Sequence, residues 1–348
     1  MSAAVLLLGG LTMFSRPAAA EASWNREAAA RYLDARAATW TTEARTRRKL
    51  DTACISCHTA VPYLLSRALL SGFSEAKPAA ELFADVESRV AGWTDNRAWY
   101  DHEADKVAQS QGAEAVLNAL VLTARDRRAG RALSPQSRAA LGYMWAQQKP
   151  AGDWDWLYFK LGPWETDGSN YWGAALAAVA ALPVAGEAPP PEESLDRLRG
   201  YLRSGLDAST SLHNRLALLW AASAWRGLLS SAEVAAQVQQ TLQGQQDDGG
   251  FRPETTPPWW PETGGDAYTT ALAAFALQQV DDPRAAVAIA RARLWLERNQ
   301  QPDGRWNALS LNKDRSGEGD FTRLLMSDAA TGFAVLALTS PVSTADAR

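Results

Sequence analysis

Cysteine and histidine are scarce in this sequence, with two and three copies among 348 residues. The two cysteines, Cys54 and Cys57, lie three positions apart, which excludes a framework of several disulfides. The formal net charge of −4 argues against nucleic acid as a partner. After the first twenty residues no apolar run is long enough to cross a bilayer, so we expect no membrane span.

Residues 1–20 have the features of a secretory signal. Residues 5–14 form an apolar run that is too short to span a bilayer, and Ala18, Ala19 and Ala20 supply small residues for cleavage before Glu21. The first four residues lack the usual Lys or Arg. We expect a signal peptide over 1–20, a single domain over 21–348 and a periplasmic or secreted location.

Both cysteines belong to the stretch Cys54-Ile55-Ser56-Cys57-His58, which reads C-x-x-C-H. This spacing attaches a c-type haem, because the two thiols reach the porphyrin vinyl groups and the adjacent imidazole binds the iron. Haem of this type is attached in an exported compartment, so the motif and the signal support each other. The sequence predicts haem c, bound covalently through Cys54 and Cys57, with His58 as iron ligand, at the start of a helix that runs to about residue 70.

Two other interpretations of the motif remain open. A disulfide or redox pair would use the same thiols, although the βαβ setting of thioredoxin-like motifs is not apparent. Structural zinc would need four ligands, and only His102 and His213 are left as further Cys or His candidates. For a haem iron, the second axial position has three candidates, His213, Met326 and His102, or no protein ligand at all.

Apolarity alternates along the rest of the chain. Amphipathic segments, which expose one face, take turns with segments that are apolar all round and should be buried. This pattern predicts an all-α protein with six outer and six inner helices in a barrel. The expected helices cover 24–50, 54–70, 78–93, 106–127, 135–148, 170–182, 192–204, 212–225, 231–245, 267–279, 283–299 and 324–338.

A repeated phrase follows three outer helices. Its copies span residues 145–154, 245–251 and 295–306, and each has Gln, then a Gly turn, then an aromatic residue. Gly provides the turn geometry, and the Gln amide is suited to capping a neighbouring helix end.

The phrases resemble the QW repeats of squalene–hopene cyclases, whose toroid also occurs in the β-subunits of protein prenyltransferases. The resemblance covers most of residues 130–340 and implies an (α/α)6 toroid with an axial ligand cavity. The catalytic groups do not carry over. The sequence has no Asp-rich D-x-D-D motif, and its C-terminal half has no cysteine for a prenyltransferase-type zinc site.

Polar residues recur near the starts of the predicted inner helices, which meet at one mouth of a barrel. Taken alone, Asp266 and Asp328 also suit helix caps. We expect His58, Glu114, Tyr171, His213, Tyr268 and Asp328 to face one cavity, with Glu114, Tyr171, Tyr268 and Asp328 as catalytic candidates. Trp99, Trp172 and Trp259 are expected to supply aromatic walls.

These observations predict an exported haem protein that binds an apolar, isoprenoid-like small molecule and carries out redox chemistry or passes electrons to a redox partner protein. The alternatives are a haem-free cyclase or prenyltransferase relative and a non-catalytic binding barrel. A sugar-degrading barrel would need paired carboxylates at its mouth, for which Glu165, Asp167, Asp266 and Asp328 are available.

Overall fold

Twelve main helices alternate between an outer and an inner ring in the computed structural model, which describes residues 24–73, 76–182, 187, 189–206 and 211–340. The expected signal peptide therefore lies outside the described residues. The outer helices are α1 (Arg26–Arg48), α3 (Lys77–Ala91), α5 (Pro135–Ala146), α7 (Glu192–Ser204), α9 (Ser231–Leu242) and α11 (Ala286–Asn299). The inner helices are α2 (Ala60–Ser66), α4 (Ala104–Arg128), α6 (Ser169–Ala180), α8 (Leu212–Ala224), α10 (Ala267–Gln278) and α13 (Leu325–Thr339).

Shorter elements join the rings: η1 (Arg67–Leu69), η3 (Pro283–Ala285) and α12 (Asp320–Arg323). The described part of the chain has isolated β-bridges but no strand. None of its helices is long and apolar enough to cross a bilayer. The all-α toroid predicted from the alternating segments is confirmed.

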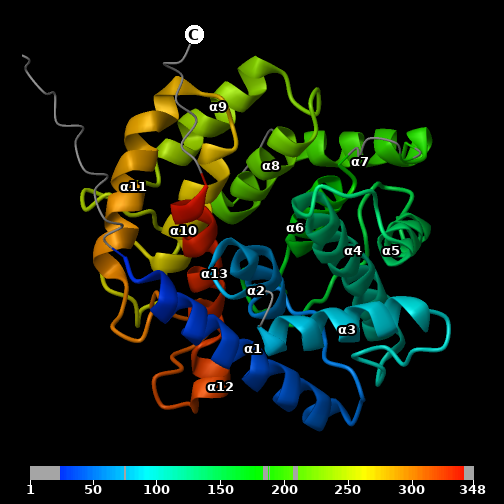
Figure 1. Ribbon diagram of the computed structural model, residues 1–348. Helices are drawn as coiled ribbons and strands as arrows, with labels where there is room; N and C mark the ends of the chain where they lie inside the picture. The colour runs from blue at the N-terminus through cyan, green and yellow to red at the C-terminus, as the bar shows by residue number, and fades with distance from the viewer. Residues whose placement is uncertain (1–23, 74–75, 183–186, 188, 207–210, 341–348) are drawn as a thin grey trace, which may run out of the picture.

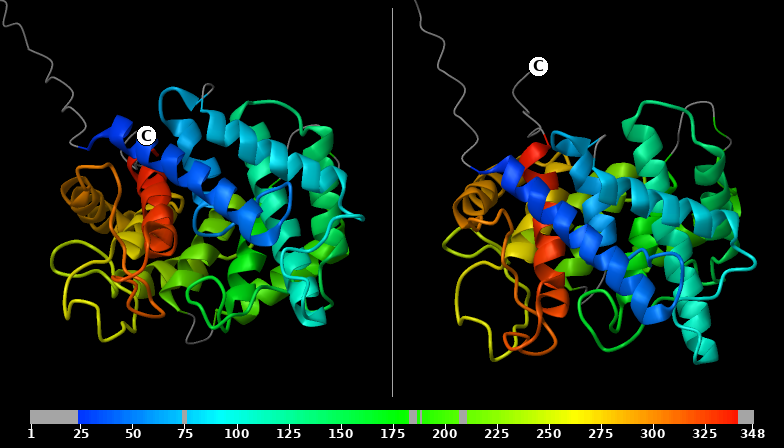
Figure 2. Two further views of the ribbon diagram at one scale, coloured as in Figure 1. Left: turned by 90° about the horizontal axis from the view of Figure 1, so that it is seen from below. Right: turned by 60° about the horizontal axis from the view of Figure 1, so that its bottom comes forward.

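Burial differs between the two rings as the sequence predicts. Outer helix α7 buries Ser194, Leu198 and Leu202, which form one stripe at four-residue spacing. Every residue of inner helix α10 is buried. Each inner helix contacts the next, and α13 returns to contact α2 and α1 (Figures 1 and 2). The first and last inner helices therefore close the barrel at a seam.

The three repeated phrases make the same contacts. In each, the Gln side-chain amide donates to the carbonyl of the turn glycine and to a carbonyl at the start of another outer helix. The pairs of acceptors are Gly152 and Ser194 for Gln148, Gly249 and Ala288 for Gln245, and Gly304 and Asn25 for Gln300. The glutamines contact the start of a neighbouring outer helix as predicted, and Gln300 also accepts the Asn25 N–H there, as a cap would. The contacts tie successive outer helices together.

The turn glycines are required by both conformation and space. Gly304 has a φ of 95°, and a Cβ there would lie 2.1 Å from the carbonyl carbon of Ala28 on α1. Gly152 and Gly249 also have positive φ and approach backbone of the next outer helix. Two phrases end on a buried Trp, and the indoles of Trp154 and Trp306 donate to carbonyls of the preceding helix.

The cysteine motif differs from its predicted secondary structure. Residues 54–56 have no regular structure, and α2 begins only at Ala60. The Ser56 hydroxyl accepts hydrogen bonds from the backbone N–H groups of Thr59 and Ala60, so it caps the helix after the motif. The expectation that the motif opens the helix was wrong because this local cap precedes the first turn.

Candidate functional site

The cysteine motif lies beside a cavity of about 290 Å³ at the barrel seam. Cys54 and His58 line it, together with side chains from the last turns of α1, the loop before α4, the loop before α6 and the start of α13. A smaller cavity of about 50 Å³ lies next to it and is lined by Cys54, Cys57 and His58. Both thiols and the imidazole are therefore next to open space inside the molecule.

Aromatic rings hold the motif in place. The Trp40 indole donates a hydrogen bond of 2.8 Å to the Cys54 carbonyl, and its ring meets the His58 ring edge-on with centroids 4.7 Å apart. Phe321 stacks on Trp40, and the Trp164 ring lies 6.0 Å from His58. The larger cavity therefore has apolar walls that suit a planar or hydrocarbon ligand.

Four arginines also line the larger cavity: Arg47, Arg48, Arg315 and Arg323. Three pair with carboxylates outside the lining, at Glu43, Glu318 and Asp320. Arg48 lies over the Tyr100 ring, 3.9 Å from its centroid. The lining is thus apolar, with four guanidinium groups and the Glu165 carboxyl in it. Guanidinium groups bind carboxylates, so this lining suits a ligand with an apolar body and carboxylate groups.

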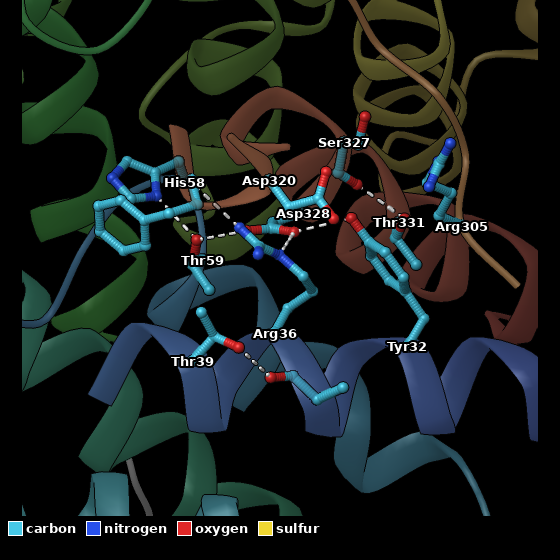
Figure 3. A network of polar contacts seen from close by, with 12 residues as sticks. Tyr32, Arg36, Thr39, His58, Thr59, Arg305, Asp320, Ser327, Asp328 and Thr331 are labelled. Atoms are coloured by element: carbon cyan, nitrogen blue, oxygen red, sulfur yellow. Dashed lines mark hydrogen bonds and ion pairs between the residues drawn. The ribbon is translucent and has the colours of Figure 1, made fainter. Parts of the chain in front are cut away.

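The His58 ring is held by a hydroxyl and a carboxylate (Figure 3). His58 Nδ1 lies 2.8 Å from Thr59 Oγ1, and Thr59 Oγ1 donates a hydrogen bond of 2.8 Å to Asp328. Burial lowers the pKa of His58 to about 3. The imidazole is therefore neutral over the physiological range, as an iron or other metal ligand must be.

Asp328 is 1% exposed and receives four hydrogen bonds. Its Oδ1 accepts from Tyr32 and Arg36, and its Oδ2 accepts from Arg36 and Thr59. Burial raises the pKa of the Asp328 carboxyl, and the hydrogen bonds from Arg36, Thr59 and Tyr32 oppose that rise. Two donors occupy each oxygen, which leaves no lone pair for a proton of its own, so the group is a carboxylate paired with Arg36.

The cysteines are free thiols in this structure. Burial raises the pKa of both Cys54 and Cys57, so neither is held as a thiolate. A reactive redox pair requires a thiolate at neutral pH, and these surroundings disfavour one. Among the described residues, no three His, Cys, Asp or Glu side chains are arranged to hold a metal ion, which counts against the zinc interpretation.

Glu114 lines the smaller cavity and pairs with Arg89 of outer helix α3. Both side chains are 5% exposed, and Arg89 also donates to the Arg97 carbonyl. Glu114 is thus in the predicted place, but its carboxylate is engaged in a buried ion pair.

Tyr268 and His213 lie behind the cavity rather than along its wall. The Trp164 indole donates a hydrogen bond of 3.0 Å to the Tyr268 hydroxyl, which lies 3.3 Å from His213 Nδ1. His213 stacks on Trp172 and borders a different pocket of about 500 Å³. The prediction that His213 shares the cavity of His58 was wrong, because Trp164 and Tyr268 fill the space between them.

Tyr171 faces away from the barrel axis. Its hydroxyl donates a hydrogen bond of 2.6 Å to the Leu202 carbonyl, and its ring packs against Tyr201 on outer helix α7. The expectation that Tyr171 faces the cavity was wrong. Successive residues of a helix are about 100° apart, and it is the next residue, Trp172, that faces His213.

The remaining predicted residues divide into those that line the cavity beside His58 and those that do not. Met326 lines the same cavity as His58, and Trp99 lines both cavities. His102 is exposed, and Trp259 is 36% exposed on a loop where its indole donates to Ser310. His102, one of the candidates for the second axial position, does not line the cavity of His58. The expectation that Trp259 forms a wall of the cavity was wrong, because its exposed ring lies outside the lining. Asp328 does not line the cavity and reaches His58 only through Thr59.

The carboxylates do not form the pair that sugar hydrolysis needs. Asp266 caps α10 through a hydrogen bond from the Thr269 N–H, Asp328 pairs with Arg36, and Asp167 is exposed. Glu165 alone of these four lines the cavity, and burial raises its pKa to about 7.

Sequence reasoning missed Trp40, Arg36 and the four cavity arginines. They belong to outer helix α1, to helix α12 and to a loop, whereas the polar pattern in the sequence marks only the starts of inner helices. The one available signal was that α1 carries Trp40, Arg47 and Arg48 directly before the motif.

Comparisons with known proteins show similarity in structure alone. No family model matches this sequence, and no curated protein matches it. A protein from Actinoplanes is 17% identical with a TM-score of 0.55, covering 90% of this chain and 98% of that one. The type II terpene cyclase MstE from Scytonema is 15% identical with a TM-score of 0.54, covering 89% and 98%. A structure described as a wild-type glycosidase is 13% identical with a TM-score of 0.56, covering 90% and 96%. At these identities the likeness shows the fold: the chain is an all-α (α/α)6 toroid like those of terpene cyclases and glycosidases.

Proposed function

We propose that this chain is an exported c-type haem protein, in which Cys54 and Cys57 bind the porphyrin, His58 binds the iron and the toroid supplies an apolar cavity. The observation that carries the proposal is that the whole C-x-x-C-H motif lies beside internal space instead of at the surface. A chance motif or a structural disulfide needs no such space.

The surrounding residues fit a haem group. His58 is neutral, and Thr59 engages its Nδ1, so Nε2 is the nitrogen available to iron. Met326 lines the same cavity and would be a second protein ligand to the iron of a bound haem. Aromatic side chains suit a porphyrin face, and the cavity arginines suit its carboxylates. A haem held by His58 and Met326 would supply one-electron transfer, and a haem held by His58 alone would also admit a small ligand.

The toroid is further proposed to bind an apolar, isoprenoid-like organic ligand. The toroid supports this idea in a limited way, because the same fold in the terpene cyclase MstE from Scytonema has been solved in complex with geranylgeranyl dihydroxybenzoate, at a TM-score of 0.50. The proposed protein would accept or deliver electrons through a redox partner protein.

The haem-free cyclase alternative has weaker support. The paired acids at Asp247 and Asp248 belong to a turn, where Asp248 accepts from the backbone N–H groups of Gly250 and Gly265. Glu165 is the acid of the cavity, and a carboxyl with a pKa of about 7 is a weak donor for alkene protonation.

The test is production of the full chain together with a cytochrome c maturation system, followed by a denaturing gel stained for haem. The wild-type band should stain and should have the mass of residues 21–348 plus one haem, because the expected signal peptide is removed and thioether bonds survive denaturation. The Cys54→Ser/Cys57→Ser double variant should not stain, whereas His102→Gln should stain like the wild type. An unstained wild-type band with two free thiols would refute the proposal.

A further inference from the structure

The hydrogen bonds around His58 determine which ring nitrogen carries its proton. Thr59 Oγ1 lies 2.8 Å from both His58 Nδ1 and Asp328 Oδ2. The Thr59 hydroxyl has one hydrogen, so it can donate to only one of these two atoms. The Asp328 carboxylate only accepts, so the Thr59 hydrogen points to Asp328. Thr59 must then accept from His58, which places the imidazole proton on Nδ1 and leaves Nε2 with its lone pair.

Asp328 is itself held in one orientation. Arg36 donates to both of its oxygens, and Tyr32 donates a hydrogen bond of 2.8 Å to Oδ1. Arg36 also donates to the Phe321 carbonyl, in the segment that covers the cavity. The carboxylate therefore cannot rotate away from Thr59 without breaking a buried ion pair.

The chain of contacts crosses the seam of the barrel (Figure 3). Tyr32 and Arg36 come from α1, His58 and Thr59 precede α2, and Asp328 comes from α13, 269 positions after Thr59. Closure of the ring is thus what places the carboxylate against the motif.

We propose that Thr59 and Asp328 are positioning residues, which hold His58 in the Nδ1–H tautomer so that Nε2 is kept for a metal. As far as the metal is concerned, this inference rests on the proposed haem function. Ligating histidines in proteins donate their other N–H to such an acceptor, which fixes the ring and raises its basicity. Here the acceptor is a threonine backed by a buried carboxylate.

The tautomer is measured on the full chain produced without haem attachment. Long-range proton–nitrogen NMR spectra distinguish the two ring nitrogens, and the chain has only three histidines. The variants His102→Gln and His213→Gln identify the His58 signals by elimination. We expect wild-type His58 to have a protonated Nδ1 and an unprotonated Nε2.

Thr59→Val keeps the shape of the side chain and removes its hydroxyl, so His58 should revert to the Nε2–H tautomer that free imidazole side chains prefer. Thr59→Ser keeps the hydroxyl and should retain the wild-type tautomer. An Nε2–H tautomer in the wild type, or an unchanged tautomer in Thr59→Val, would overturn the proposal. The wild-type spectrum alone decides the matter if Thr59→Val does not fold.

The claim that Nε2 is kept for a metal has a separate test in the haem-loaded protein. A carboxylate-backed Nδ1–H makes the imidazole a stronger electron donor, so Thr59→Val should raise the midpoint potential and Thr59→Ser should leave it near the wild-type value. Equal potentials in all three proteins would overturn that claim. Absence of haem from the wild type would refute the proposed function, while the NMR result would still decide the tautomer.

Discussion

Gln300 and Asn25 exchange two hydrogen bonds although 275 positions separate them in the sequence. The Asn25 N–H donates to Gln300 Oε1 at 2.6 Å, and Gln300 Nε2 donates to the Asn25 carbonyl at 3.0 Å. Asn25 caps α1 and Gln300 follows α11, so this pair joins the last outer helix to the first. The repeated phrase thereby closes the outer ring, as α13 and α2 close the inner one.

Replacing Gln300 with Ala should destabilise the protein by about 2 kcal/mol, because three hydrogen bonds of about 0.5–1.5 kcal/mol each are lost. The neighbouring Gln301 is exposed, and Gln301→Ala should change the free energy of unfolding by less than about 0.5 kcal/mol. Urea unfolding followed by circular dichroism measures both. Equal effects for the two variants would mean that the contact between Gln300 and Asn25 does not stabilise the protein.

Replacing Glu114 with Gln should cost about 3 kcal/mol of stability, because it leaves the Arg89 guanidinium buried without its counter-charge. The matched control is Glu27→Gln, which breaks an exposed pair with Arg31 and should cost less than about 1 kcal/mol. Thermal and urea unfolding of both variants would reveal the difference. A Glu114→Gln protein as stable as Glu27→Gln would show that the buried pair is not needed for folding.

Stability should fall as the pH is lowered from about 6.5 toward 3, partly because of His213. Burial lowers its pKa from 6.5 to about 3, so in this window the unfolded chain binds a proton that the folded chain excludes. Each such histidine contributes a slope of up to about 1.4 kcal/mol per pH unit.

His213→Phe keeps a flat ring against Trp172 and should reduce that slope between pH 6 and 5, because the variant has no imidazole to protonate at this position. The measurement is the urea midpoint at a series of pH values. An identical slope in the wild type and in His213→Phe would show that His213 is protonated in the folded state.

Met326→Leu should leave covalent haem attachment intact and lower the midpoint potential, because an axial thioether raises it. Met144 is fully buried but does not line the cavity, so Met144→Leu should leave the potential unchanged. Potentiometric titration of the haem-loaded variants makes the comparison. An unaltered potential in Met326→Leu would remove Met326 as an axial ligand.

The toroid was predictable because its signals are local and repeated. Segments such as 192–204 and 267–279 differ in how completely they are apolar, and each Gln–Gly phrase marks the end of an outer helix. The direction of a single side chain within a helix carries no comparable signal. Tyr171 and Trp172 are both aromatic and adjacent, yet one packs outward against α7 and the other against His213.

The supports of His58 could not be predicted for a different reason. Arg36, Thr59 and Asp328 meet only because the barrel closes, and nothing near residue 59 in the sequence indicates a partner 269 positions later. The position of Asp328 at the start of an inner helix predicted that it lies near the cysteine motif. Its role as a partner of Arg36 and Thr59 required the structure.

The most direct test of the central claim is a pyridine haemochrome spectrum of the chain, produced with haem maturation and then denatured and extracted with acidic acetone. Non-covalent haem is removed by this extraction, whereas thioether-bound haem stays with the protein. We predict one haem per chain, with the spectrum of a porphyrin attached through two thioethers, and no free thiol at Cys54 or Cys57. A colourless extracted protein with both thiols free would contradict the account.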